Sequence, residues 1–101
     1  MSNQLDTPVE EKLKVDPPPK YNVVMLNDDK TTFEFVQAML ITYFGKTIEQ
    51  SKIIANEIHL KGEAIVGKNY DLDTAETKVK KISIEAQAHK FPLTCKIQEQ
   101  V

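Results

Sequence analysis

The chain has 101 residues, of which 13 are basic, all of them lysine, and 15 are acidic, so its formal net charge is -2. This length suits one domain with one core, and the single cysteine, Cys95, excludes a disulfide framework and every multi-thiolate metal site. The lack of arginine argues against phosphate and nucleic-acid recognition, and no apolar run approaches the roughly 20 residues of a membrane span. We therefore expect a small cytoplasmic domain that needs no metal and no cofactor.

Residues 1–19 are polar and charged, and they end in three consecutive prolines, Pro17, Pro18 and Pro19. Consecutive prolines favour an extended polyproline II conformation and cannot lie inside a helix. The few apolar residues before them are too sparse to build a core. We expect a flexible N-terminal extension over residues 1–19 and a folded core domain over residues 20–101.

The folded part is expected to begin with a buried strand. Residues 21–26 are apolar and β-branched, and they run directly into residues 27–29, an Asn-Asp-Asp turn signal. Thr31 is followed three positions later by Glu34, which is the spacing of a capping box. Apolar residues then recur at helical spacing as far as Gly45, so we predict a helix with Thr31 as its N-cap.

A second capping box, from Thr47 to Gln50, predicts another helix that ends at Gly62. A brief strand is predicted over residues 63–66, Glu-Ala-Ile-Val, bounded by Gly67.

A loop is expected over residues 68–73, followed by a third helix. Asp73 and Glu76 have the spacing of a helix N-cap, and Pro92 marks the exit from the helix. The apolar residues of this segment fall on one helical face, and Lys78 falls largely on the opposite, solvated side.

The last predicted element is a strand over residues 93–98, which alternate strictly between apolar and polar. The predicted order is thus β-α-α-β-α-β. It favours a small α/β (α+β) domain in which three helices pack on a three-stranded antiparallel sheet.

Two polar groups of residues carry the candidate chemistry: Asn27-Asp28-Asp29 after the first strand, and His59 near the end of the second helix. Asn and Asp are also the default residues of turns, and a helical histidine is often simply half-buried. Asp28 and His59 could serve a small hydrolase or a regulatory enzyme subunit as acid and base, but no serine or cysteine lies in a nucleophile-like context. A third possible function is that of a plain interaction domain without a pocket.

These residues are better suited to accept hydrogen bonds. An ammonium group has three N–H donors, and Asn27, Asp28 and neutral His59 offer a carbonyl oxygen, a carboxylate and a ring nitrogen. Beside apolar residues, such a trio would recognise an amine attached to a hydrophobic side chain.

Five segments of the chain resemble the ClpS adaptors of the bacterial N-degron pathway and stand in that family's order. They are Leu26-Asn27-Asp28-Asp29-Lys30-Thr31, Phe35-Val36, His59-Leu60-Lys61-Gly62, Ala75-Glu76-Thr77-Lys78-Val79 and Pro92-Leu93. The resemblance covers about residues 20 to 98.

The resemblance implies an adaptor and not an enzyme, with no catalytic residues. ClpS proteins bind the first residue of proteins that begin with Phe, Tyr, Trp or Leu and deliver them to a Clp AAA+ ATPase–protease. By residue match, Asn27, Asp28 and His59 would hold the α-ammonium group, and Asp29 and Thr31 would support the loop. The hydrophobic pocket would be formed by Phe33, Val36, Met39, Ala55, Ile58 and Leu93.

The chain departs from the family pattern at two pocket positions. Phe33 stands where a methionine is usual and where the family excludes β-branched first residues, and Ala55 stands where a larger apolar residue is common. The resemblance also implies a partner surface at Glu76 and Lys78 for the N-terminal domain of the ATPase. It makes residues 1–19 an extension that the ATPase engages, and we expect a monomer.

Overall fold

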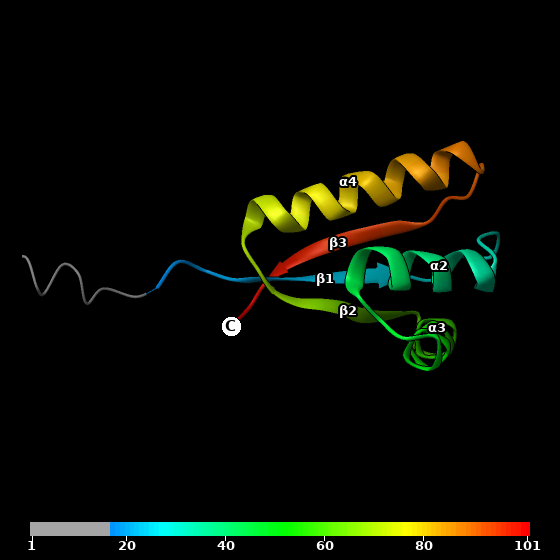
Figure 1. Ribbon diagram of the computed structural model, residues 1–101, viewed down its shortest axis with the longest axis horizontal. Coiled ribbons are helices and arrows are strands. Elements are labelled where there is room, and N and C mark those ends of the chain that lie inside the picture. The colour runs from blue at the N-terminus through cyan, green and yellow to red at the C-terminus, as the bar shows by residue number, and fades with distance from the viewer. Residues whose placement is uncertain (1–16) are drawn as a thin grey trace, which may run out of the picture.

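Residues 17–101 are the part of the chain that the computed structural model describes (Figure 1). They form an α+β fold in the predicted order, which confirms the fold class. The elements are β1 (Tyr21–Leu26), α2 (Phe33–Phe44), α3 (Ile48–Lys61), β2 (Glu63–Tyr70), α4 (Leu72–Ala88) and β3 (Thr94–Glu99).

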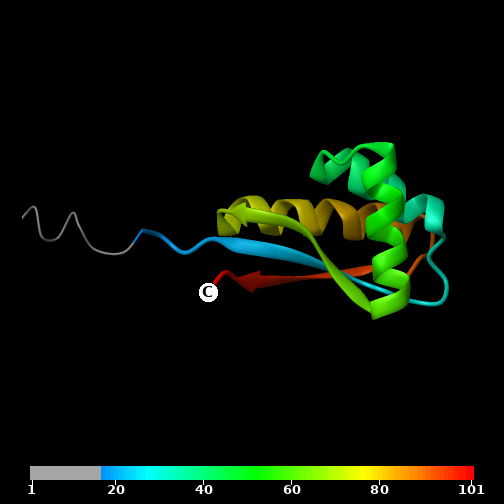
Figure 2. The same cartoon turned by 90° about the horizontal axis from the view of Figure 1, so that it is seen from below.

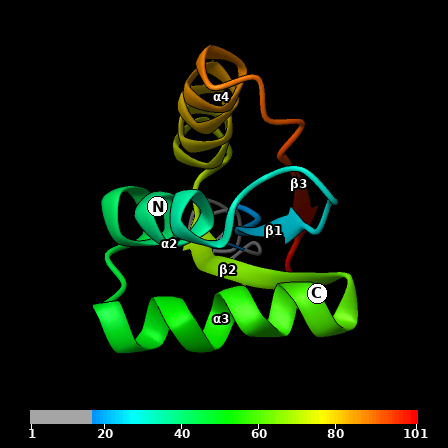
Figure 3. The ribbon, with the colours of Figure 1, turned by 90° about the vertical axis from the view of Figure 1, so that its right-hand side faces the viewer.

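The sheet has the strand order β2-β1-β3, with β1 antiparallel to both neighbours. Val23 lies opposite Ile97, and Met25 lies opposite both Cys95 and Ala64. Because side chains alternate along a strand, Val23 and Met25 point to the same face of the sheet. The helices cover this face, as the end-on view in Figure 3 shows.

The helices differ in direction. Helix α4 runs along the strands, whereas α3 crosses them at the end of the sheet where β1 ends (Figure 2). The loop after β1, helix α3 and the start of helix α2 therefore meet at one end of the molecule (Figure 3).

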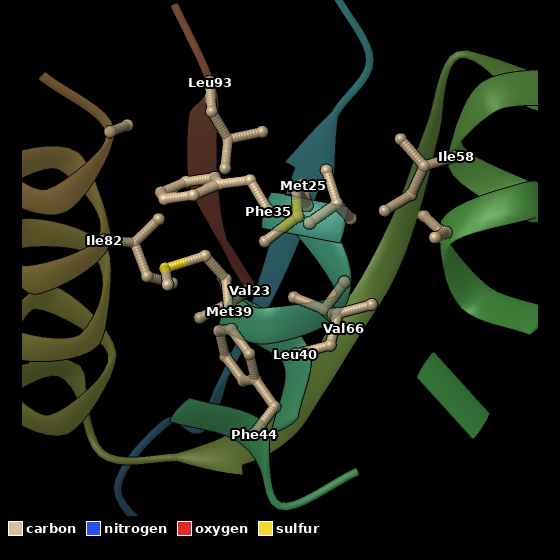
Figure 4. Packing of buried hydrophobic residues seen from close by; sticks show 14 of the residues in the cluster. Val23, Met25, Phe35, Met39, Leu40, Phe44, Ile58, Val66, Ile82 and Leu93 are labelled. Atoms are coloured by element: carbon tan, nitrogen blue, oxygen red, sulfur yellow. The ribbon is translucent and has the colours of Figure 1, made fainter. Parts of the chain in front are cut away.

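Fifteen buried apolar side chains form the core between the sheet and the helices (Figure 4). They come from every helix and from the two adjacent strands β1 and β2, and Leu93 joins them just before β3. They are Val23, Met25, Phe35, Val36, Met39, Leu40, Phe44, Ala55, Ile58, Ala64, Val66, Ala75, Ile82, Ala86 and Leu93.

The first helix begins one residue later than predicted. Its N-cap is Thr32, whose hydroxyl oxygen accepts a hydrogen bond from the Phe35 amide at 3.1 Å. The Thr31 hydroxyl instead donates to the Asp28 carboxylate in the preceding loop. The second capping box, between Thr47 and Gln50, is confirmed.

Strand β2 continues past Gly67 to Tyr70, so the prediction that Gly67 bounds the strand is wrong. A Cβ atom on Gly67 would lie 2.5 Å from the Tyr70 ring and 2.8 Å from the Phe44 ring. The glycine thus allows two aromatic rings to approach the strand and does not end it.

Helix α4 begins at Leu72, and its N-cap is Asp71 instead of Asp73. The Asp71 side chain makes no capping hydrogen bond; its carboxylate instead pairs with the Lys20 ammonium at 2.7 Å. This ion pair links the start of α4 to the segment that leads into β1.

The predicted extension over residues 1–19 lies outside the described residues, apart from the exposed Pro17, Pro18 and Pro19. Within residues 17–101, no helix is long and apolar enough to cross a membrane.

Candidate functional site

The loop between β1 and α2 is organised around the Asp28 carboxylate. One of its oxygens accepts hydrogen bonds from the backbone amides of Lys30, at 2.8 Å, and Thr31, at 2.7 Å. The other oxygen accepts a hydrogen bond from the Thr31 hydroxyl at 2.7 Å. An aspartate that bonds to amides two and three residues ahead closes a tight turn, so the sequence Asp-Asp-Lys-Thr fixes the loop locally.

These bonds also set the charge of the loop. Partial burial raises the pKa of Asp28, but the hydrogen bonds from the Thr31 hydroxyl and from the Thr31 and Lys30 amides outweigh it and lower the pKa below its usual value. Asp28 is therefore a carboxylate at neutral pH. A carboxylate has about four acceptor positions, and three are occupied, so one remains for a ligand.

A backbone hydrogen bond joins this loop to the end of α3. The Asn27 amide donates to the Gly62 carbonyl at 2.9 Å, and Gly62 ends the helix in the left-handed conformation with a φ of 91°. His59 lies on the last turn of the same helix. The bond joins residues far apart in the chain and holds the Asn27-Asp28 loop next to His59.

A cavity of about 350 Å³ lies between the loop, the start of α2 and α3. Polar residues line one part of it and apolar residues the other. The polar residues are Asn27, Asp28, Asp29, Thr31 and His59. The apolar residues are Phe33 and Val36 from α2 and Ala55 and Ile58 from α3. Nine residues predicted for the site thus surround one cavity.

Two predicted pocket residues, Met39 and Leu93, do not line this cavity. Both are buried in the core, with exposed fractions of 3% and 4%. Met39 lies one helical turn beyond Val36, where α2 faces α4, and Leu93 lies on the approach to β3 (Figure 4). One contact that shapes the site carries no sequence signal, because the Gly62 carbonyl that accepts the Asn27 hydrogen bond is a backbone group.

The cavity is equipped to accept hydrogen bonds from a cation. Its polar part presents a carboxylate, an amide side chain and an exposed imidazole, which together can accept the three N–H bonds of an ammonium group. The adjoining walls are apolar and suit a hydrocarbon or aromatic side chain.

The cavity is poorly equipped for covalent catalysis. The Thr31 hydroxyl, which lines it, is bonded to Asp28. The Ser51 hydroxyl is buried and donates to the Ile48 carbonyl. Burial raises the pKa of the Cys95 thiol to about 12, which keeps it protonated at neutral pH. Among residues 17–101, no three His, Cys, Asp or Glu side chains gather closely enough to hold a metal ion.

The predicted partner residues lie on α4, outside this cavity. Glu76 is exposed, but Lys78 is half-buried, so the expectation that it is solvated opposite the core is wrong. Its ammonium group donates to the Tyr43 carbonyl at 2.7 Å and lies 5.8 and 5.3 Å from the centres of the Phe44 and Tyr70 rings. A second cavity of about 270 Å³ is lined by Tyr43, Asp73, Thr74, Thr77, Lys78 and Lys81.

Comparison with known proteins gives a consistent result. The ClpS family model, described as ATP-dependent Clp protease adaptor protein, matches residues 16–96. A ClpS adapter protein from Desulforapulum autotrophicum is 45% identical over 83 residues, which are 82% of this chain and 79% of the relative. One from Oleidesulfovibrio alaskensis is 40% identical over 94 residues, or 93% of this chain and 88% of the relative.

A solved structure agrees with the sequence relatives. The structure of Agrobacterium tumefaciens ClpS2 bound to L-phenylalaninamide is similar to this chain with a TM-score of 0.78 and 31% sequence identity. The match covers 83% of this chain and 100% of that chain.

Proposed function

This chain belongs to the ClpS family of ATP-dependent Clp protease adaptor proteins, and we propose that it binds proteins whose first residue is Phe, Tyr, Trp or Leu and delivers them to a Clp AAA+ ATPase in the cytoplasm. Members of this family are named adaptors and not enzymes, so a hydrolase that uses Asp28 and His59 is set aside. The cavity between the loop, α2 and α3 likewise sets aside an interaction domain without a pocket.

The observation that supports the proposal is the union of hydrogen-bond acceptors and apolar walls in one cavity. In the proposed complex, the α-ammonium group of the substrate donates to Asn27, Asp28 and His59. Asp29 and Thr31 keep the loop in place, and the first side chain enters between Phe33, Val36 and the residues of α3. L-phenylalaninamide, the ligand of the Agrobacterium relative, has the same two features, an α-amino group and an aromatic side chain.

The expected affinity follows from these contacts. Burying a Phe or Leu side chain contributes about 1.5–3 kcal/mol, and hydrogen bonds to charged groups contribute about 1.5–3 kcal/mol each, less the entropy cost of association. A dissociation constant in the micromolar range is therefore expected for a short peptide, which corresponds to a binding free energy of about -8 kcal/mol.

Fluorescence anisotropy with peptides that differ only in their first residue tests this function. Peptides that begin with Phe, Tyr, Trp or Leu should bind, and those that begin with Ala or Glu should not. His59→Ala should weaken binding roughly tenfold or more, because it removes one acceptor of a charged donor. The matched control is His89→Ala, since His89 is exposed and lies outside the cavity lining. Equal binding of all first residues would refute the proposal.

We further propose that this chain docks as a monomer on the N-terminal domain of the ATPase through Glu76 and Lys78, with residues 1–19 as the segment that the ATPase engages. The exposure of Glu76 and the neighbouring cavity on α4 support this docking surface. Binding of the isolated ATPase domain should be weakened by Glu76→Ala and unchanged by Glu49→Ala, an exposed glutamate on α3. Both variants should bind the peptides normally. Loss of peptide binding in Glu76→Ala would point to misfolding instead of a docking role.

A further inference from the structure

Phe33 carries the one phenyl ring among the described residues that line the cavity, and it lies on the apolar wall, whereas the imidazole of His59 belongs to the polar part. Phe33 is also the exposed part of the apolar wall. Its exposed fraction is 43%, whereas that of Val36 is 8%, that of Ala55 is 3% and that of Ile58 is 2%. The ring of Phe33 is therefore the largest apolar surface of the wall that a bound side chain can newly cover.

The backbone holds Phe33 firmly at this position. Phe33 is the first residue of α2, directly after the N-cap Thr32. The Thr32 hydroxyl accepts a hydrogen bond from the Phe35 amide at 3.1 Å, and the Thr32 carbonyl accepts one from the Val36 amide at 3.2 Å. A phenylalanine has only two side-chain torsions, so little conformational entropy is lost when a ligand packs on its ring.

An aromatic wall residue distinguishes ligands in a way that aliphatic ones cannot. Aromatic pairs prefer offset or edge-to-face contacts, which add stabilisation beyond the area they bury. The remaining apolar wall residues, Val36, Ala55 and Ile58, respond only to the size and shape of a ligand side chain.

We propose that Phe33 makes the cavity selective for aromatic first residues over aliphatic ones. This inference rests on the proposed function of the cavity. The aromatic contribution corresponds to roughly a two- to tenfold preference beyond that expected from buried area.

The first test measures how Phe33 changes the preference between two otherwise identical peptides that begin with Phe and with Leu. Phe33→Leu keeps an apolar residue but removes the ring, and it should reduce the Phe-to-Leu affinity ratio two- to tenfold. Phe33→Tyr keeps the ring and should restore the ratio. Ile84→Ala, which alters a 57% exposed apolar residue on α4, should leave the ratio unchanged. An unchanged ratio in Phe33→Leu, with both peptides still bound, would overturn the inference and leave the proposed function intact.

A second test needs no variant of the protein, so it does not depend on whether Phe33→Leu folds. The wild-type chain is titrated with peptides that begin with Phe or with cyclohexylalanine, which has a saturated ring of similar size. The Phe peptide should bind two- to tenfold more tightly. Equal affinities would overturn the role of the aromatic ring, whereas failure of both peptides to bind would overturn the proposed function as well.

Discussion

Replacing Thr31 by valine tests the loop that carries the proposed acceptors. The substitution preserves the shape of the side chain and removes one hydrogen bond, from the Thr31 hydroxyl to the Asp28 carboxylate at 2.7 Å. Such a bond to a charged group contributes about 1.5–3 kcal/mol, but both residues are only half-buried, so solvent competes and we expect about 1 kcal/mol. The two amide bonds to Asp28 remain, so the loop should weaken without unfolding.

The effect of Thr31→Val should depend on pH. Because the pKa of Asp28 is lowered in the folded state, its carboxylate stabilises the fold above the unfolded pKa of about 3.9, and this contribution is lost as the pH falls through the folded value. Thr31→Val should raise the folded pKa toward the ordinary value. The difference in unfolding free energy should therefore be full at pH 7 and shrink as the pH falls below the unfolded pKa of about 3.9.

Urea denaturation of the wild-type chain and of Thr31→Val, at pH 7 and at an acidic pH, measures the difference in unfolding free energy. An NMR titration follows the Asp28 carboxyl group directly. For a domain of this size, 1 kcal/mol corresponds to a shift of the urea midpoint by roughly 1 M. An unchanged midpoint at pH 7, together with an unchanged pKa of Asp28, would refute the role assigned to Thr31.

Three further predictions follow from the wall, the sheet and α4. Phe33→Ala should extend binding to peptides that begin with Ile or Val, because it removes a rigid ring from the cavity; an unchanged peptide panel would exclude Phe33 as a gate. At pH 8, Cys95 should react with a thiol reagent at least about 100-fold more slowly in the folded chain than in urea, because its pKa is raised to about 12; similar rates would contradict its burial. Lys78→Met should lower the unfolding free energy by about 1–2 kcal/mol, since it removes the bond to the Tyr43 carbonyl and two cation–π contacts, whereas Lys81→Met should change it little. Equal effects of the two substitutions in urea denaturation would argue against a structural role for Lys78.

The elements of this fold were predictable because their signals are local. The capping box from Thr47 to Gln50, the apolar run of β1 and the alternation before the C-terminus each specify an element within a few residues. The errors lie at the ends of elements, where side-chain contacts that the sequence pattern does not show decide the outcome. Asp71 starts α4 but its carboxylate pairs with Lys20, 51 positions away in the chain.

The candidate site was also predictable only in part from the sequence. The hydrogen-bond acceptors Asn27, Asp28 and His59 were predictable from their own chemistry, although Asn and Asp are also ordinary turn residues. The apolar walls of the cavity were predicted by residue match to a known family. The resemblance also placed Met39 and Leu93 in the pocket, whereas both side chains are buried in the core and neither lines the cavity. The position of Lys78 against two rings depends on Tyr70 and Phe44, which come from other elements.

The central claim is that the cavity recognises a protonated α-amino group attached to a hydrophobic side chain. The most direct measurement compares one peptide that begins with Phe in two forms, with a free and with an acetylated N-terminus, by isothermal titration calorimetry. Acetylation removes the positive charge and two N–H donors, so Asn27, Asp28 and His59 lose their shared partner. We predict micromolar binding of the free peptide and at least about 100-fold weaker binding of the acetylated one. Equal affinities of the two forms would contradict the account, because they would mean that the cavity reads only the side chain.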